Sequence, residues 1–108
     1  MNKDVGNALV PPLADVDRLV HEPARLAILS LLYVVESSDF IFLMNQTGLS
    51  WGNLSAHMAK LEDAGYLQVE KVFKEKRPKT TLRLTDKGRR AFRGYAIKMK
   101  QALDGLDL

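Results

Sequence analysis

Positive charge gathers in one short stretch, FKEKRPKTTLRL, at residues 73–84. Four cations and one acid lie between Phe73 and Leu82, and cations this close repel one another unless an anion meets them. Lysine binds a phosphate as a point charge, and arginine also enters narrow minor grooves of DNA, where the negative potential is enhanced. The stretch therefore predicts a phosphate-binding loop whose contacts are Lys76, Arg77 and Lys79.

A second candidate surface lies in residues 51–64, WGNLSAHMAKLEDA. Leu54, Met58 and Leu61 recur at helical spacing and are expected to be buried. The other positions near the start carry short or amide-bearing side chains, which let a DNA backbone approach closely and can contact base edges or phosphates. The predicted contacts are Ser50, Gly52, Asn53, Ser55, Ala56 and Lys60.

Structural alternatives exist for several of these residues. Ser50 and Asn53 would serve only as helix caps, because their side chains bind the free N–H groups of a first turn. Ser55 would then only meet solvent. Trp51 has two open roles, either packing against a neighbouring helix or stacking on a sugar or base.

The sequence contains none of the residue patterns considered for catalysis or metal binding. The chain has no cysteine, which excludes disulfides, thiolate zinc sites and a cysteine nucleophile. It has no GxSxG turn, no glycine-rich phosphate loop and no paired-carboxylate motif. His57 has no ligand-type partner at i±4, so we expect a structural, hydrogen-bonding histidine. We expect neither an enzyme nor a cofactor or metal site.

Charge is unevenly distributed along the 108 residues, a length that suits one domain. The net charge is +3, yet residues 71–100 contain 12 basic and 2 acidic side chains, against 4 and 9 in residues 1–70. Such asymmetry indicates a nucleic acid or another polyanion as partner, the alternative being a basic face in contact with water. The longest apolar run, residues 26–35, is too short to cross a bilayer. The first residues lack a signal-peptide pattern, so a cytoplasmic protein is expected.

Helical periodicity and capping residues organise the first two thirds of the chain. Ser37-Ser38-Asp39 and Ser50 provide N-cap chemistry, and Gly48 and Gly65 suit the left-handed turn that ends a helix. Apolar spacing supports the same boundaries. The predicted helices are residues 13–20, 23–35, 39–47 and 51–64.

A hairpin and a long helix complete the chain. Leu67, Val69 and Phe73 are expected to share one face of the first strand by alternation, with Lys71 as the exception. KEKRPK, which includes Pro78, is expected to form the loop. A last helix, 86–103, begins after Thr85. This order predicts a mainly α fold with a small β-hairpin, a winged helix-turn-helix in which the basic loop is the wing.

Three parts of the chain are expected. Residues 1–12 form a flexible leader, residues 13–84 the winged-helix core, and residues 85–108 a dimerisation helix packed on the same domain. The last helix has an apolar stripe close to heptad spacing, which predicts a homodimer seam, with intramolecular packing as the alternative. The stripe consists of Phe92, Tyr95, Met99 and Leu103.

Three segments resemble the MarR/ArsR-type winged-helix transcriptional regulators: RLAILSLL, LSWGNLSAHMAKLEDAGYL and KRPKTTLRLTDKGRRAF. The chain is most similar to the small stand-alone winged-helix DNA-binding domains of bacteria and archaea, over about residues 13–100. The resemblance implies a homodimer on a pseudo-palindromic operator, joined by the last helix together with the first. It places recognition contacts at Gly52, Asn53, Ser55 and Ala56, and wing contacts at Arg77 and Lys79.

One departure from that family bears on regulation. Metal-sensing members have a cysteine-containing motif in the recognition region, or histidine and acidic ligands in the terminal helix. This chain has no cysteine, and residues 86–103 contain no histidine. Metal sensing by those routes is not expected, and any effector would be a small organic molecule in the dimer cleft or a partner protein.

The sequence thus predicts a regulator of transcription that binds double-stranded DNA sequence-specifically as a dimer, by analogy a repressor. One alternative is a winged helix used for protein interaction, which would expose an apolar patch on the third helix and need no basic wing. The other is an RNA-binding winged helix, because lysine binds the phosphates of either nucleic acid.

Overall fold

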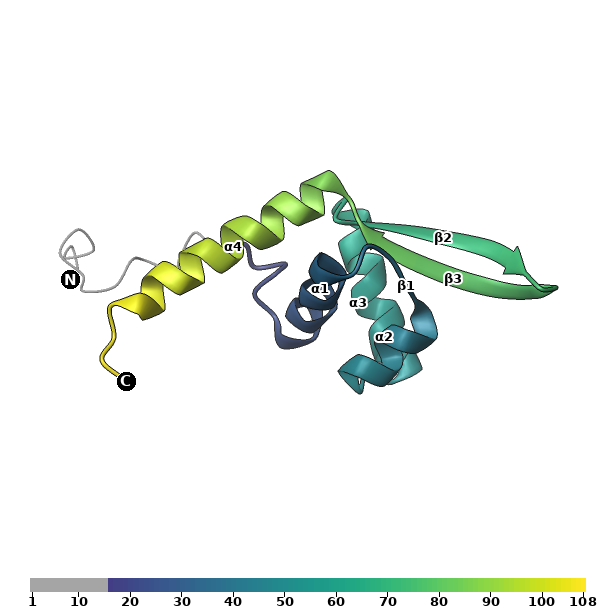
Figure 1. Ribbon diagram of the computed structural model, residues 1–108, viewed down its shortest axis with the longest axis horizontal. Helices are drawn as coiled ribbons and strands as arrows, with labels where there is room; N and C mark the ends of the chain where they lie inside the picture. The colour runs from purple at the N-terminus through teal and green to yellow at the C-terminus, as the bar shows by residue number, and fades with distance from the viewer. Residues whose placement is uncertain (1–15) are drawn as a thin grey trace.

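The computed structural model describes residues 16–108, and Figure 1 shows helices at its centre, a long hairpin at one end and the last helix running toward the other. The described elements follow the predicted winged-helix order, with one additional strand. They are α1 (Pro23–Val34), β1 (Ser38–Asp39), α2 (Phe40–Thr47), α3 (Trp51–Asp63), β2 (Leu67–Lys74), β3 (Arg77–Leu84) and α4 (Asp86–Asp104).

Side-chain caps mark the starts of α2 and α3. The Asp39 carboxylate accepts a hydrogen bond from the Phe42 N–H at 2.7 Å, and the Ser50 hydroxyl accepts one from the Asn53 N–H at 3.1 Å. Each cap satisfies a donor that the first turn of a helix leaves free. Gly48, with φ of 72°, ends α2 in the left-handed region, where glycine carries no Cβ penalty. The predicted helix-turn-helix is confirmed with these caps.

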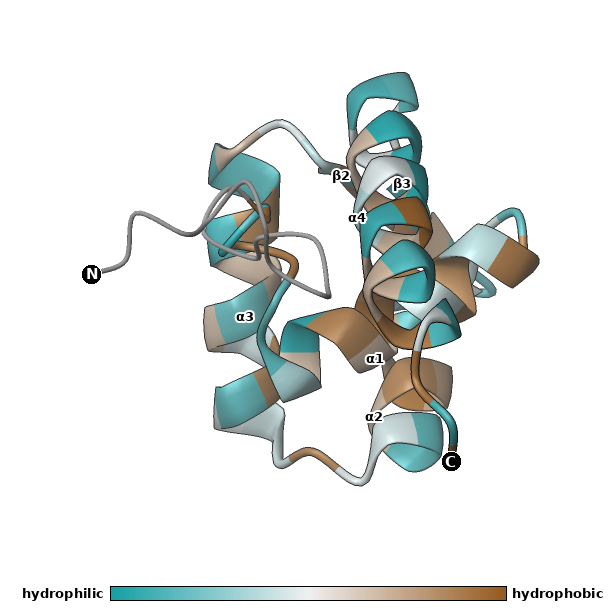
Figure 2. Ribbon diagram, turned by 90° about the vertical axis from the view of Figure 1, so that its left-hand side faces the viewer, coloured by the Kyte–Doolittle hydropathy of each residue, from teal (hydrophilic) through white to brown (hydrophobic). Residues whose placement is uncertain are grey.

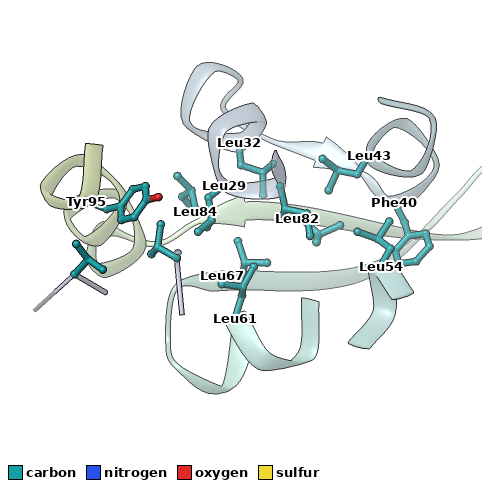
Figure 3. Packing of buried hydrophobic residues seen from close by; sticks show 13 residues of the cluster. Leu29, Leu32, Phe40, Leu43, Leu54, Leu61, Leu67, Leu82, Leu84 and Tyr95 are labelled. Atoms are coloured by element: carbon teal, nitrogen blue, oxygen red, sulfur yellow. The ribbon is translucent and has the colours of Figure 1, made fainter. Parts of the chain in front are cut away.

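The core lies where the three short helices meet the base of the sheet (Figure 3). Full burial of one aliphatic side chain contributes about 1.5–3 kcal/mol, so this cluster is the main stabilising feature. In Figure 2, α1 is coloured mainly as hydrophobic, whereas α3 and α4 carry mainly hydrophilic colours. The buried cluster includes Ile28, Leu29, Leu32, Phe40, Leu43, Leu54, Leu61, Leu67, Leu82 and Leu84.

The sheet has three strands in the order β1-β3-β2, all antiparallel. The sequence reading missed β1, which has two residues and pairs Ser38 with Leu82 and Asp39 with Thr81. A strand of two residues is too short to show an alternating pattern. From the sequence, Ser38 and Asp39 were assigned only to the N-cap of α2. Asp39 in fact performs both roles, because it pairs with β3 and caps α2.

The hairpin is longer and its loop shorter than predicted. Only Glu75 and Lys76 form the turn, and Phe73 pairs with Pro78 inside the ladder. Placing Pro78 in the loop was therefore wrong. Strand β1 meets β3 only at Leu82 and Thr81, so β3 has a free edge at residue 78, where a missing N–H is tolerated.

Phe73 shares its strand face with the buried Leu67, yet it is 79% exposed. The strands continue beyond the helices that cover their base, so the alternation that buries Leu67 has nothing to pack against at Phe73. Strand periodicity identifies which face a side chain shares but not how far the covering layer extends.

The helix predicted at residues 13–20 is not observed over residues 16–20, which form turns, and residues 13–15 lie outside the described part of the chain. The Asp17 carboxylate accepts hydrogen bonds from the N–H groups of Leu19 and Val20, at 2.9 and 3.3 Å. Such local bonds compete with helical backbone bonding. The Tyr66 hydroxyl donates to the same carboxylate. The predicted leader, residues 1–12, also lies outside the described residues.

A tight junction joins α3, the sheet and α4. The Tyr66 carbonyl accepts a hydrogen bond from the Thr85 N–H at 3.0 Å, and the Thr85 hydroxyl donates to the Gly65 carbonyl at 2.5 Å. Thr85 also accepts the Gly88 N–H, which caps α4 as predicted. A Cβ placed on Gly88 would lie 2.2 Å from the Tyr66 carbonyl oxygen, so only glycine fits there.

Helix α4 packs on the rest of the domain through its aromatic residues. The Tyr95 hydroxyl and the His21 Nδ1 are 2.7 Å apart, and the Phe92 and Tyr33 rings have centroids 5.1 Å apart. Arg89 donates to the Tyr33 carbonyl at 3.3 Å, which satisfies a free carbonyl in the last turn of α1. Residues 16–22 and α1 therefore fix the direction of α4.

We expect Gly88→Ala to lower the free energy of unfolding by about 2–3 kcal/mol, because its methyl group would collide with the Tyr66 carbonyl. Urea unfolding followed by circular dichroism measures the change. Gly94→Ala is the matched control on the same helix, since a Cβ there meets nothing within 4 Å. It should stabilise the protein by up to about 1 kcal/mol. Equal effects of the two changes would contradict the proposed close contact.

Candidate nucleic-acid interface

The predicted contact residues of α3 lie on its open side. Leu54 and Leu61 are buried and Met58 is half-buried against the core, as the spacing predicted. Ser55 is half-buried, and the other predicted contacts are exposed. Ser50 is occupied as an acceptor by its cap, yet its hydroxyl hydrogen can still donate to a phosphate. The exposed residues are Ser50, Gly52, Asn53, Ala56 and Lys60.

Gly52 has no packing reason to be glycine. A Cβ at this position would meet nothing within 4 Å, and glycine inside a helix costs about 1 kcal/mol relative to alanine. A missing side chain on the exposed first turn of α3 instead leaves room for a partner to approach the backbone.

A small polar cluster fixes α3 to the start of α1. The Arg25 Nη1 lies 3.2 Å from the His57 Nδ1, and the Arg25 Nε donates to the Leu19 carbonyl at 2.6 Å. Arginine can only donate, so His57 accepts through Nδ1 and carries its proton on Nε2. This confirms the structural role predicted for His57. The sequence reading missed Arg25, whose role depends on two contacts distant in the chain.

Glu22 completes this cluster. Its carboxylate accepts the Arg25 N–H at 2.7 Å as the N-cap of α1, and it lies 3.9 Å from the His57 Nδ1. The hydrogen bond from the Arg25 backbone lowers the pKa of Glu22 below its ordinary value of 4.5, and the positive charge of the Arg25 side chain acts in the same direction, against the opposing effect of burial.

The wing ends in a two-residue turn with unfavourable backbone angles. Glu75 and Lys76 have φ of 55° and 65°, values that favour glycine or asparagine in a turn of this kind. Lys74 pairs directly with Arg77, and like charges opposite each other on two strands are destabilising. The predicted wing contacts did not include Lys74. An anion at this tip would relieve the repulsion.

Lys79 lies in a different environment from the exposed Lys76 and Arg77. Its Nζ is 3.6 Å from the Asp39 carboxylate, and its side chain is 42% exposed. Because the pair is partly exposed, it contributes little to stability. Lys79 is therefore shared between the cap of α2 and any phosphate that approaches the wing.

The start of α3 and the wing strand lie side by side. A shallow pocket of about 180 Å³ is lined by residues from β1, α2, α3 and β3, so the first residue of α3 and Lys79 of the wing strand border one hollow. Its lining residues are Asp39, Phe40, Ile41, Trp51, Pro78, Lys79 and Thr80.

The predicted dimer stripe divides between two environments. Tyr95 is 6% exposed and bonded to His21, so its side chain belongs to the interior of the protomer. Phe92 and Met99 are half-buried, and Leu103 is 52% exposed. The sequence reading missed Ile97, which is 47% exposed on the same helix because it falls outside the heptad-like spacing.

Residues 16–108 provide neither a metal-binding cluster nor a membrane-spanning helix. No group of three or more histidine, cysteine or acidic side chains in that range is placed to hold a metal ion. No helix within it is long and apolar enough to span a membrane.

The chain has a three-helix unit, α1 to α3, that contains a capped helix-turn-helix, and a basic hairpin follows it. This arrangement defines a winged-helix protein of the DNA-binding class. A family model for winged helix DNA-binding domains matches residues 24–103, and the chain belongs to this family. An uncharacterised protein of Methanocaldococcus jannaschii is 36% identical over 84 residues, which are 78% of this chain and 91% of that protein.

Solved structures support the same assignment. A transcriptional regulator homologue from Pyrococcus horikoshii OT3 has a TM-score of 0.81 and 30% identity, covering 85% of this chain and 91% of its own. The PcaV transcriptional regulator from Streptomyces coelicolor shares the fold, with a TM-score of 0.67, 24% identity, and coverage of 85% and 69%. A MarR-family regulator from Silicibacter pomeroyi does so with a TM-score of 0.65, 20% identity, and coverage of 81% and 57%. The chain is a winged-helix, DNA-binding regulator of transcription and not an enzyme, and its fold is like that of MarR-family regulators.

We expect Glu22→Gln to lower the free energy of unfolding at pH 7, because the amide caps α1 without a negative charge. The folded-state pKa of Glu22 is lowered, so its ionisation stabilises the protein above pH 4.5, and this contribution is lost as pH falls through the lowered pKa. The difference from wild type should therefore shrink in acid. Unfolding curves at pH 7 and pH 3 measure it, with Glu36→Gln as an exposed control. A pH-independent difference would contradict the charge effect.

Proposed function

We propose that this protein is a dimeric repressor that acts in the cytoplasm by occupying a pseudo-palindromic operator. The observation that carries the proposal is that the exposed start of α3 and Lys79 of the basic wing border one hollow. Each α3 would enter a major groove, and the two copies would contact successive grooves about 34 Å apart. Arg77, Lys76 and Lys79 would contact the flanking backbone or minor groove.

Dimerisation is assigned to the exposed part of α4. We propose a seam through Phe92, Met99 and Leu103, with Ile97 added and Tyr95 supporting it from within the protomer. This part of α4 lies away from the wing, so a partner here would leave both DNA-binding surfaces open (Figure 1). An effector that changes the angle between two such helices would change the spacing of the two α3 helices. It would be a small organic molecule or a partner protein.

One observation favours the alternative function of binding another protein. Trp51, the first residue of α3, is 63% exposed, and Ile41 of α2 is 53% exposed. The strained, cationic wing tip has no role in that alternative, so DNA binding accounts for more of the surface. RNA binding uses the same phosphate contacts and is tested in the same experiment.

We expect the purified protein to bind DNA upstream of its own gene more tightly than random duplex, with a steep dependence on salt. Six to eight phosphate contacts per dimer would give a log–log slope of roughly −5 to −7. Arg77→Ala should weaken binding and reduce the slope by about 2, one contact per protomer. Fluorescence anisotropy over a salt series measures both.

The control is Lys100→Ala, an exposed cation on α4 at the opposite end from the wing. It should leave affinity and slope close to wild type. Absence of duplex binding at low salt would overturn the proposal, and tight binding to an RNA hairpin in the same buffer would then favour the RNA-binding alternative.

Gly52→Ala should affect stability and binding in opposite directions. The protein should become more stable by up to about 1 kcal/mol, because alanine favours the helix and its methyl group meets nothing. Affinity for the operator should fall, because the methyl group occupies space that a close DNA backbone needs. Thermal unfolding and anisotropy measure the two effects. Gly94→Ala, which gives the same helical gain on α4, should leave affinity unchanged, and unchanged affinity for Gly52→Ala would contradict the predicted close approach.

A further inference from the structure

Trp51 is held in place while most of its side chain remains exposed. Its ring centroid lies 4.4 Å from that of Phe40, with 50° between the ring planes, and Phe40 is itself buried. The Trp51 side chain is nevertheless 63% exposed at the first position of α3. One side of the indole is therefore fixed by the core, and the remainder is presented to a partner at little further cost in side-chain entropy.

The indole belongs to a small apolar area that we call the Trp51 shelf, formed by Ile41, Trp51 and Pro78. These residues come from α2, α3 and β3 and line the shallow pocket between the helix-turn-helix and the wing. The shelf is thus continuous with the proposed contacts of α3 on one side and of the wing on the other. The shelf therefore lies between the two regions that a bound DNA strand would contact.

The two charged residues that line the pocket beside the shelf, Asp39 and Lys79, form an ion pair with each other. The Asp39 carboxylate accepts the Phe42 N–H with one oxygen and lies 3.6 Å from the Lys79 Nζ with the other. Free cations lie instead at the wing tip, and phosphate-compatible donors lie at Ser50. An apolar, electrically balanced area between two anion-binding regions matches an uncharged sugar between two phosphates.

We propose that the Trp51 shelf binds a deoxyribose of the DNA strand that runs from α3 to the wing, with the indole packed against the sugar. This inference rests on the proposed function and adds a subsite to it. A sugar has the same shape at every base pair, so the contact adds affinity on all sequences without reading any of them. The contact is not ionic, so it does not contribute to the salt slope.

The chain contains a single tryptophan, so its fluorescence reports on this subsite alone. We expect saturating duplex to protect Trp51 from acrylamide, a neutral quencher that the charge of DNA does not repel. Trp51→Ala should raise Kd about tenfold on operator and random duplex alike, with an unchanged salt slope. Trp51→Phe should recover most of the affinity. Val34→Ala, which removes an 83% exposed apolar side chain outside the shelf, should bind as wild type.

The outcomes separate this inference from the function on which it rests. If wild type binds duplex but acrylamide reaches Trp51 equally with and without DNA, and Trp51→Ala binds as wild type, the subsite is wrong and the regulator proposal stands. A loss confined to one operator sequence would mean base recognition, and a flatter salt slope would mean a phosphate contact. Either result overturns the sugar assignment. No binding by wild type overturns both proposals. Circular dichroism of each variant verifies that it is folded.

Discussion

The hydrogen-bonded junction around Tyr66 determines where the two extended parts of the molecule lie. Tyr66 follows α3, its carbonyl accepts the Thr85 N–H, and Gly88 packs against the same carbonyl. The Tyr66 carbonyl, just after α3, thus contacts both Thr85, at the base of the hairpin, and the first turn of α4. Burial raises the pKa of Tyr66 to about 12, and its hydrogen bond to the Asp17 carboxylate acts in the same direction. The hydroxyl therefore keeps its proton at neutral pH and holds residues 16–22 to the junction.

The arrangement explains why the recognition surface is rigid at its base and exposed at its end. The buried cluster covers the first residues of β2 and the last of β3, and the strands then continue without a covering layer. Strain and charge repulsion accumulate at Glu75, Lys76 and the Lys74–Arg77 pair, where little packing opposes them. Costly features that persist at an exposed position are typical of functional sites.

Local signals in the sequence predicted the elements that depend on local physics. Asp39, Ser50 and Thr85 occupy the expected caps because a cap needs only its own next turn. The predictions fail where the local structure depends on residues that are distant in the chain. Strand β1 exists because Leu82 and Thr81 lie beside it, and Tyr95 is buried because residues 16–22 reach it. The exposed positions of α3 follow from helical spacing, whereas the Lys79–Asp39 pair and the Trp51 shelf depend on how β3 crosses α2.

The wing is a fully paired hairpin up to its two-residue turn, with no flexible loop between the strands. A disordered basic loop of the same composition would lose conformational freedom on meeting DNA, and part of its electrostatic attraction would be offset by that loss. Here the ordering has already taken place during folding and is supported by the core. The protein is thereby preorganised for its ligand, and mutations that loosen the hairpin base would weaken binding through entropy although they touch no nucleotide.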